Sequence, residues 1–313
     1  MNIENLLRET LADMADEERP PAPGRFLQVR ERRARGRGLA LAAASIVAAL
    51  AVGSTVVVQG MSSRAPSGDV AGQQNAVPQS AVTVTVEEGT RLSRLFEKLS
   101  SLTGRPVAEF EKAAKDSAAL GLPAYARGAL EGFAFPGTYT FAPTVSPGEI
   151  LRAMVARFVQ AAEDTDLVDG ARRAGRTPLE ILTIASIVQA DAGRDEDMPK
   201  IARVIYNRLK RKMLLRLDST VLYGLGKYGA GTVRVEDLKN RSPYNTYRRF
   251  GLPPGPIGNP GGEAIRAALK PASGSWLHYV TIDPKTGVTK FASSETEFAQ
   301  LVEEQRGKKP GAE

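Results

Sequence analysis

Carboxylates provide most of the chemistry that this sequence can offer. The 313 residues contain no cysteine and a single histidine, His278. A zinc site or a histidine-based catalytic triad would lack its usual side chains, so we expect no metal and no other cofactor. One candidate for proton transfer is Asp218, which follows an apolar run and could be buried. A carboxyl group in an apolar pocket acquires a raised pKa and can then act as a general acid–base near neutral pH.

The stretch 242–260, SPYNTYRRFGLPPGPIGNP, combines backbone restriction with ligand-binding side chains. Its five prolines exclude a helix or a central strand. They also restrict the backbone in advance, which lowers the ordering cost of binding. Aromatic rings, amides and hydroxyls suit a polyhydroxylated ligand. The alternative is a rigid structural loop whose tyrosines pack on the core. The candidate binding residues here are Tyr244, Asn245, Thr246, Tyr247, Pro254 and Asn259.

The N-terminal part of the chain has the pattern of a membrane anchor. Residues 1–37 are polar and end in an arginine-rich segment, and residues 38–58 form an uncharged run. At about 1.5 Å per residue, such a helix spans a bilayer of roughly 30 Å. The flanking arginines predict a cytoplasmic N-terminus, with the remainder outside the cytoplasmic membrane. A cleaved signal peptide and a buried soluble helix are the alternatives. Residues 59–80, rich in Ser, Gly, Gln and Pro, predict a flexible linker.

The remaining residues predict an α+β fold. Alternating Val and Thr at 81–86 indicate a strand, and 276–282 with 288–291 indicate a hairpin. Apolar periodicity and helix-start signals predict helices at 107–119, 148–162, 177–192 and 198–212. Residues 305–313 predict a disordered polar tail. The formal net charge of +7 suits a membrane or an anionic wall polymer, and no nucleic-acid-binding motif is present.

Several long motifs, in order, resemble the endolytic murein transglycosylases, the YceG-like or MltG family. SPYNTY and GLPPGPIGNPG carry the resemblance most strongly, and it covers roughly residues 81–300. The other matching motifs are LEGFAFPGTY at 130–139, IASIVQADAG at 184–193, VIYNRL at 204–209, LRLDSTVLYGL at 215–225 and AIRAALKPA at 264–272.

This resemblance implies a LysM-like subdomain over residues 81–125 and a YceG-like catalytic domain over 126–304. It implies endolytic cleavage of the β-1,4 bond between N-acetylmuramic acid and N-acetylglucosamine in nascent peptidoglycan. The products would carry 1,6-anhydro ends, which stops strand elongation. The implied partners are glycan strands, penicillin-binding proteins and the division or elongation machinery. Ser186, Asn207 and Tyr223 lie in the matching motifs and are further candidates for substrate binding.

The sequence departs from the family pattern at the implied catalytic position. The family glutamate lies three residues after Ser186, where this chain has Gln189. A carboxamide cannot exchange a proton near neutral pH. Asp191 is two residues further, about 200° around the helix, so it cannot simply replace Gln189. The acid–base thus stays open among Glu131, Asp191 and Asp218, although Asp191 could pair with Arg194 and Asp218 could cap a helix. The alternative function is a catalytically impaired glycan-binding or scaffold protein.

Overall fold

The computed structural model describes residues 81–307 except 228–232 and 284, and these residues belong to one compact unit. The arm, transmembrane helix and linker predicted for residues 1–80 lie outside the described residues. Within the described ranges, no helix is both long enough and apolar enough to cross a membrane.

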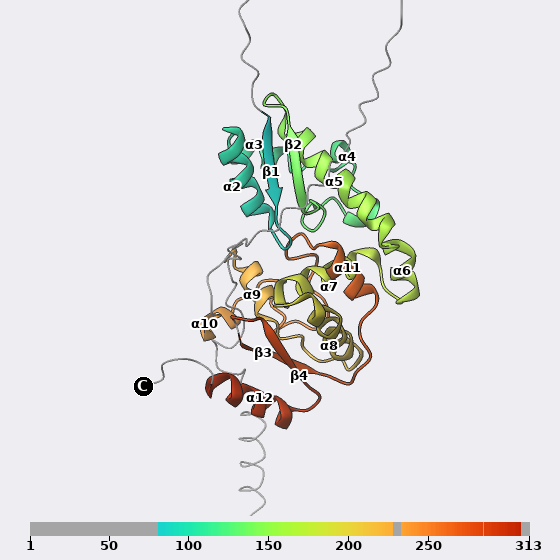
Figure 1. The fold of residues 1–313 in the computed structure, drawn as a ribbon, viewed down its shortest axis with the longest axis vertical. Coiled ribbons are helices and arrows are strands. Elements are labelled where there is room, and N and C mark those ends of the chain that lie inside the picture. The colour runs from blue at the N-terminus through green and yellow to red at the C-terminus, as the bar shows by residue number, and fades with distance from the viewer. Residues whose placement is uncertain (1–80, 228–232, 284, 308–313) are drawn as a thin grey trace, which may run out of the picture. The chain divides into compact units, whose positions relative to one another are not determined.

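A two-stranded antiparallel sheet and a group of helices form the N-terminal part of the described chain (Figure 1). β1 (Val82–Val86) pairs with β2 (Gly137–Phe141) so that Val84 faces Tyr139. The valines of β1 at 84 and 86 are buried and its threonines are exposed, as an alternating strand requires. Helix α2 (Leu92–Thr103) packs on β1, α3 (Val107–Ala114) packs on α2 and on α5 (Pro147–Asp164), and α4 (Ser117–Leu120) packs on α5.

Helix α7 (Pro178–Asp191) lies at the centre of the second group of elements. Every residue from Ile181 to Val188 is buried. The helix start expected from the sequence is confirmed, because Thr177 and Glu180 form a reciprocal capping box. The elements that pack on α7 are a 3-10 turn at Ala124–Ala126 and the helices α6 (Leu167–Arg173), α8 (Met198–Lys210), α9 (Asp218–Gly224) and α11 (Gly262–Leu269). A 3-10 turn at Asp195–Asp197 packs on α8, and α10 (Val235–Leu238) packs on α9.

The C-terminal part contains the predicted hairpin and one more helix. β3 (His278–Asp283) pairs antiparallel with β4 (Val288–Ala292), and α12 (Glu295–Gly307) packs on both strands. The predicted polar tail begins too early, because α12 continues to Gly307. Gln305 is buried and donates from Nε2 to the Thr281 carbonyl over 2.7 Å. His278 lies in β3, where Arg208 Nη2 and His278 Nδ1 are 2.9 Å apart.

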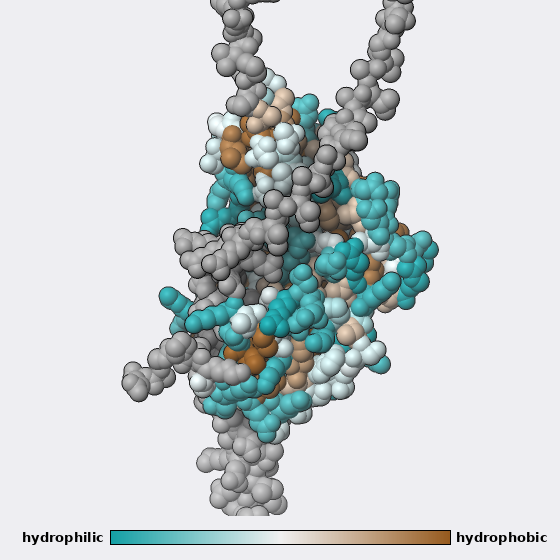
Figure 2. Space-filling model, viewed as in Figure 1, coloured by the Kyte–Doolittle hydropathy of each residue, from teal (hydrophilic) through white to brown (hydrophobic). Residues whose placement is uncertain are grey.

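The predicted α+β class is confirmed, with two boundary corrections. The helix expected over 107–119 ends at Ala114, and Asp116 then caps α4 by accepting from the Ala119 N–H over 3.0 Å. Helix α8 ends at Lys210 rather than at 212, because Lys212 has a left-handed φ of 57°. On the face seen in Figure 2, hydrophilic side chains cover most of the described surface, and hydrophobic ones form only small separate areas.

Gly132 allows the turn after Glu131 to approach the proline-rich stretch. Its φ is +92°, and a Cβ there would lie 2.5 Å from Pro256 Cγ. We expect Gly132→Ala to lower the free energy of unfolding by about 2–4 kcal/mol through strain and overlap. Gly104→Ala is the matched control, because Gly104 has φ +68° but no atom within 4 Å of the added Cβ. That control is expected to cost about 1 kcal/mol. If urea unfolding shows the same loss of unfolding free energy for both variants, the close approach of Gly132 to Pro256 is contradicted.

Candidate active site

Glu131 lies in the turn before β2 and is held by two different segments. Its Oε1 accepts from the Leu92 backbone N–H over 3.2 Å, and its Oε2 accepts from the Tyr223 hydroxyl over 3.1 Å. The side chain is partly buried. Desolvation raises the pKa of Glu131 to about 7, although the bonds from Leu92 and Tyr223 oppose that rise. A carboxyl group with this pKa can both donate and accept a proton at neutral pH.

Two partly exposed tyrosines and an arginine surround this carboxyl group. The rings of Tyr223 and Tyr244 lie 4.6 Å apart between centroids, at an interplanar angle of 55°. The guanidinium carbon of Arg91 is 5.1 Å from the centre of the Tyr223 ring, and its Nη1 donates to the Lys227 carbonyl over 2.9 Å. Sequence reasoning missed Arg91, because a single arginine after a turn carries no recognisable signal.

Gln189 is held near the same turn but has its own partner. Its Oε1 accepts from the backbone N–H of Gly261, the N-cap of α11, over 3.0 Å. A Cβ on Gly89 would lie 3.4 Å from Gln189 Cγ, so the turn that leads to Leu92 passes close to Gln189. Because Leu92 donates to Glu131, the turn at 89–92 contacts both Gln189 and Glu131. Gln189 can accept and donate hydrogen bonds at this position, but it cannot transfer a proton near neutral pH.

Asp191 and Asp218 form a second, buried pair of carboxyl groups. Tyr279 donates to Asp191 Oδ2 and Tyr247 donates to Asp218 Oδ1, each over 2.6 Å. Desolvation raises the pKa of Asp191 to about 6. Desolvation, with the negative charge of Asp191, raises the pKa of Asp218 to about 7. The charge of Asp191 therefore disfavours ionisation of Asp218.

The surroundings of this pair correct two expectations. Arg194 does not pair with Asp191, because its Nη1 donates to Glu196 over 2.9 Å. Asp218 makes no helix cap, because its carboxyl group receives the Tyr247 hydroxyl. Among the described residues, the buried Asp191 Oδ1 and Ser219 Oγ make no hydrogen bond of ordinary geometry, although the Ser219 hydroxyl helps to limit the rise in the pKa of Asp191. Tyr279 and Ser219 were not predicted.

Several predicted sugar-binding groups instead hold the backbone of the proline-rich stretch. Asn259 is fully buried, with Oδ1 accepting from the Ala134 N–H over 2.9 Å and Nδ2 donating to the Thr90 carbonyl over 2.8 Å. Ser186 Oγ accepts from the Ile257 N–H over 3.0 Å. These side chains satisfy buried backbone groups of a segment that has no regular secondary structure.

The other amide and hydroxyl candidates are also part of the framework. Asn245 Nδ2 donates to the carbonyls of Leu238 and Asn240, and Thr246 Oγ1 accepts from the Leu217 N–H. Asn207 Nδ2 donates to the carbonyls of Gly274 and Trp276, which fixes the approach to β3. Of the predicted binding residues, Tyr223, Tyr244 and Tyr247 remain partly exposed and Pro254 is exposed.

The two carboxyl clusters adjoin through shared elements. Helix α9 carries Asp218 near its start and Tyr223 near its end, and the rise between them is about 7.5 Å. Residues 244–247 also connect the two clusters, because Tyr244 contacts Tyr223 and Tyr247 donates to Asp218. Glu131 is the accessible member of this set of acids, and the Asp191–Asp218 pair lies deeper.

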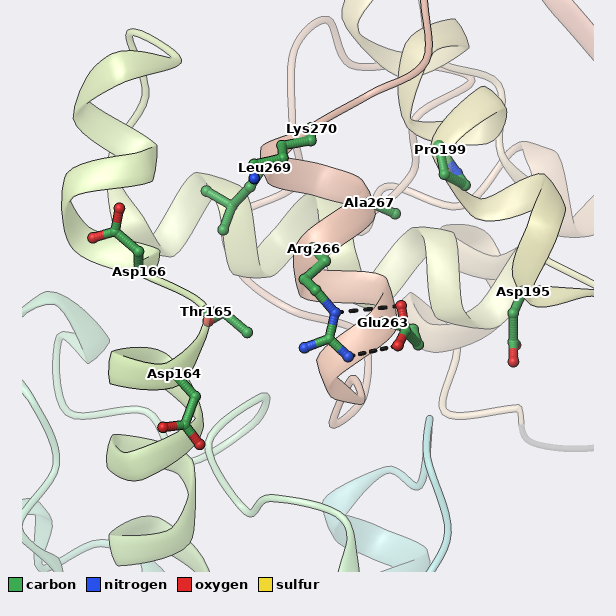
Figure 3. Close-up of a pocket in the computed structure, with 10 residues that line it drawn as sticks. All are labelled: Asp164, Thr165, Asp166, Asp195, Pro199, Glu263, Arg266, Ala267, Leu269 and Lys270. Atoms are coloured by element: carbon green, nitrogen blue, oxygen red, sulfur yellow. Dashed lines mark hydrogen bonds and ion pairs between the residues drawn. The ribbon is translucent and has the colours of Figure 1, made fainter.

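A pocket of about 410 Å³ lies elsewhere, between α5, α8 and α11 (Figure 3). Glu263 and Arg266 form an ion pair on its α11 side, with Arg266 Nη2 and Glu263 Oε1 2.6 Å apart. No residue predicted for catalysis or substrate binding lines this pocket. Its surface therefore contributes nothing to the candidate site around Glu131.

Comparison with known proteins identifies the family of this chain. The chain belongs to the YceG-like family, whose model matches residues 37–304. The endolytic murein transglycosylase of Bacillus subtilis strain 168 is 40% identical over 153 residues, which is 48% of this chain and 41% of that protein. The protein of the same name from Streptococcus pneumoniae D39 is 33% identical over 186 residues, covering 57% and 33% of the two chains.

A solved structure supports the fold over a larger share of the chain. The crystal structure of a YceG-like protein from Listeria monocytogenes matches with a TM-score of 0.64 and 30% sequence identity. The match covers 70% of this chain and 76% of that one. By contrast, the chain spans less than half the length of the two transglycosylases that it matches.

Proposed function

We propose that this protein is an endolytic lytic transglycosylase that cleaves nascent peptidoglycan and uses Glu131 as its acid–base. The observation that carries the proposal is the partly buried Glu131 carboxyl group, whose pKa is raised to about 7 beside the rings of Tyr223 and Tyr244. Membership of the YceG-like family and similarity to proteins named endolytic murein transglycosylase support the reaction class.

In the proposed reaction one carboxyl group acts twice. Protonated Glu131 donates to the oxygen between N-acetylmuramic acid and N-acetylglucosamine as the bond from that oxygen to the anomeric carbon breaks. The resulting oxocarbenium-like centre is attacked by the 6-hydroxyl of the same muramic acid residue. The Glu131 carboxylate takes the hydroxyl proton, so the 1,6-anhydro ring closes and the acid is regenerated. No water is consumed, and a second carboxylate is unnecessary.

The tyrosines and arginine are proposed to position the acid and the sugar. Tyr223 orients the Glu131 carboxyl group, and the exposed parts of Tyr223 and Tyr244 offer aromatic surface to a sugar ring. Arg91 places a positive charge close to Glu131, which limits how far burial raises its pKa. Tyr247, Pro254 and the backbone of the proline-rich stretch extend this surface.

The proposal includes the predicted organisation of the whole chain. Residues 38–58 would anchor the protein in the cytoplasmic membrane, with residues 1–37 cytoplasmic and residues 59–80 as a linker. Residues 81–125 would form a LysM-like subdomain and residues 126–304 the catalytic domain. The β1–β2 pairing joins these two parts into one unit, because β1 lies in the first and β2 in the second. Penicillin-binding proteins and division or elongation proteins are the proposed partners at the wall.

Product analysis tests the reaction class. The protein would be incubated with uncrosslinked glycan strands, and mass spectrometry would identify the new ends together with the strand-length distribution. We expect 1,6-anhydro muramic ends and rapid shortening of long strands, since an endolytic enzyme cuts internally. Reducing ends, which require water as the nucleophile, would contradict the proposed mechanism.

Gln189 favours one other function, a glycan-binding protein without turnover. Its amide occupies the family's glutamate position and is bound to the Gly261 N–H. This alternative predicts that the wild type binds strands without cutting them, and that Gln189→Glu creates activity. If the wild type cleaves strands, and Gln189→Glu cleaves them at a similar rate, this alternative is excluded.

Tyr223→Phe is expected to alter the pH profile of cleavage. The reaction begins with protonated Glu131, so the rate should fall as pH rises through about 7. Tyr223 donates to the ionised carboxylate and lowers its pKa, so loss of the hydroxyl should move the falling limb upward by about one pH unit. Tyr125→Phe is the control, because Tyr125 packs against Phe133 instead. If the pH at which the cleavage rate falls is the same in Tyr223→Phe as in the wild type, the role of Glu131 as the acid is contradicted.

A further inference from the structure

A cluster of cations around one exposed phenylalanine forms a surface that the proposed reaction does not use. Two chain segments far apart in the sequence meet here. Leu214 and Phe250 form an isolated antiparallel β-bridge, and the Arg216 N–H donates to the Thr246 carbonyl over 3.1 Å. We call this surface the cationic face, and it consists of Lys210, Arg211, Lys212, Arg216, Arg241, Arg248, Arg249 and Phe250.

The charges of the cationic face are not neutralised by nearby acids. Segments 210–216 and 241–250 contain no aspartate or glutamate. Among the ion pairs of the described chain, none involves a cation of this face. Arg249 donates to the backbone carbonyls of Ser242 and Arg241. Like charges so close together repel, and an anionic partner would remove that repulsion.

The cationic face also carries an exposed aromatic ring on a backbone of defined conformation. Phe250 is 71% exposed, more than any other large hydrophobic residue of the described chain. Lys212 and Arg216, on either side of the β-bridge, have left-handed φ values of 57° and 48°. Non-glycine residues adopt this conformation at a cost, which only a well-determined surrounding structure maintains. The fold therefore holds this exposed arrangement against local preference.

We propose that the cationic face docks on the headgroup surface of a bilayer that contains anionic lipids. Cations attract the lipid phosphates, and an aromatic ring inserts at the boundary between headgroups and acyl chains. A soluble polyphosphate, which has no apolar part, would use the cations alone and gain nothing from Phe250. The face continues directly into the segment that carries Tyr244 and Tyr247, so docking holds these tyrosines near the lipid surface. This contact is separate from the predicted anchor at residues 38–58.

Hydrogen exchange of the full chain on bilayers tests the docking locally, whether or not an anchor also holds the protein. The bilayers would be nanodiscs of zwitterionic lipid, with or without about one-third anionic lipid. We expect the backbone amides of 241–250 to exchange at least 10-fold more slowly with the anionic lipid, and this protection to fall at high salt. Arg248→Gln/Arg249→Gln and Phe250→Ser should each abolish most of it. Lys112→Gln/Lys115→Gln, which neutralises two exposed cations elsewhere, is the matched control.

Two results would overturn the proposal. Equal exchange in the two kinds of nanodisc would exclude lipid docking by this face. If soluble polyphosphate slows exchange of the 241–250 amides, and Phe250→Ser does not reduce this protection, the cationic face binds an anionic polymer instead. Because the readout is amide exchange and not glycan cleavage, an inactive enzyme would not mimic either result. Circular dichroism of each variant would show that it folds.

Discussion

Replacing Glu131 by glutamine is expected to lower the rate of glycan cleavage by about 10²–10⁴-fold, the usual contribution of general acid–base catalysis. Glutamine keeps the size of the side chain, and its single carbonyl oxygen can still accept from the Tyr223 hydroxyl, so only the bond from the Leu92 N–H is lost and folding and glycan affinity should change little. The loss should therefore appear in turnover and not in binding. Initial rates of 1,6-anhydro end formation and strand affinity, measured on the same preparations, check this expectation.

Glu87→Gln is the control for the Glu131 experiment. Glu87 is an exposed acid of the neighbouring turn, and its substitution removes a charge close to the site without removing the proposed acid. It should retain nearly the full rate. A Glu131→Gln protein that cleaves as fast as this control would place the acid elsewhere, with Asp218 the next candidate.

Replacing Asp218 by asparagine is expected to stabilise the protein at pH 8 by about 2–4 kcal/mol. Burial raises the pKa of Asp218 from 3.8 to about 7. As pH rises from about 4 to 7, the unfolded state loses this proton first, so the free energy of unfolding falls. A shift of about three units corresponds to at most about 4 kcal/mol. Asparagine stays neutral and can still accept from Tyr247, which avoids that loss.

Urea unfolding at pH 4.5 and pH 8 checks the Asp218 prediction. The wild type should lose stability between these two pH values, and Asp218→Asn should lose much less. Near pH 4 the two proteins should be almost equally stable, because the native acid is protonated there. Asp116→Asn, at an exposed helix cap, is the control and should not change the pH dependence in this way. A destabilised Asp218→Asn protein at pH 8 would mean that the ionised carboxylate is favoured in the fold.

Local features of the fold could be predicted from sequence because they depend on nearby residues. The capping pair of Thr177 and Glu180, the hairpin that contains His278 and the absence of a regular element in 242–260 are examples. The missed break after Ala114 shows the limit of this reasoning. There the Asp116 side chain competes for backbone N–H groups and starts a new helix.

The candidate site depended on contacts that the sequence does not encode locally. Glu131 could be selected as an acid, but its raised pKa depends on burial and on partners 39 residues before it and 92 residues after it. Asn245 and Asn259 have the chemistry of sugar ligands, yet a proline-rich segment without ladder hydrogen bonds uses them to satisfy buried backbone groups. The predicted separation of Gln189 from Asp191 agrees with their different partners, Gly261 and Tyr279.

The most direct test of the central claim is one cleavage assay on four proteins: wild type, Glu131→Gln, Gln189→Glu and the double variant Glu131→Gln/Gln189→Glu. New 1,6-anhydro ends would be counted by mass spectrometry at equal protein and strand concentrations. If Glu131 is the acid–base, the two proteins that keep it are active and the two that lack it have lost at least about 99% of the rate. Product from the double variant, or product from Gln189→Glu when the wild type gives none, would place the chemistry at position 189 and contradict the assignment of Glu131.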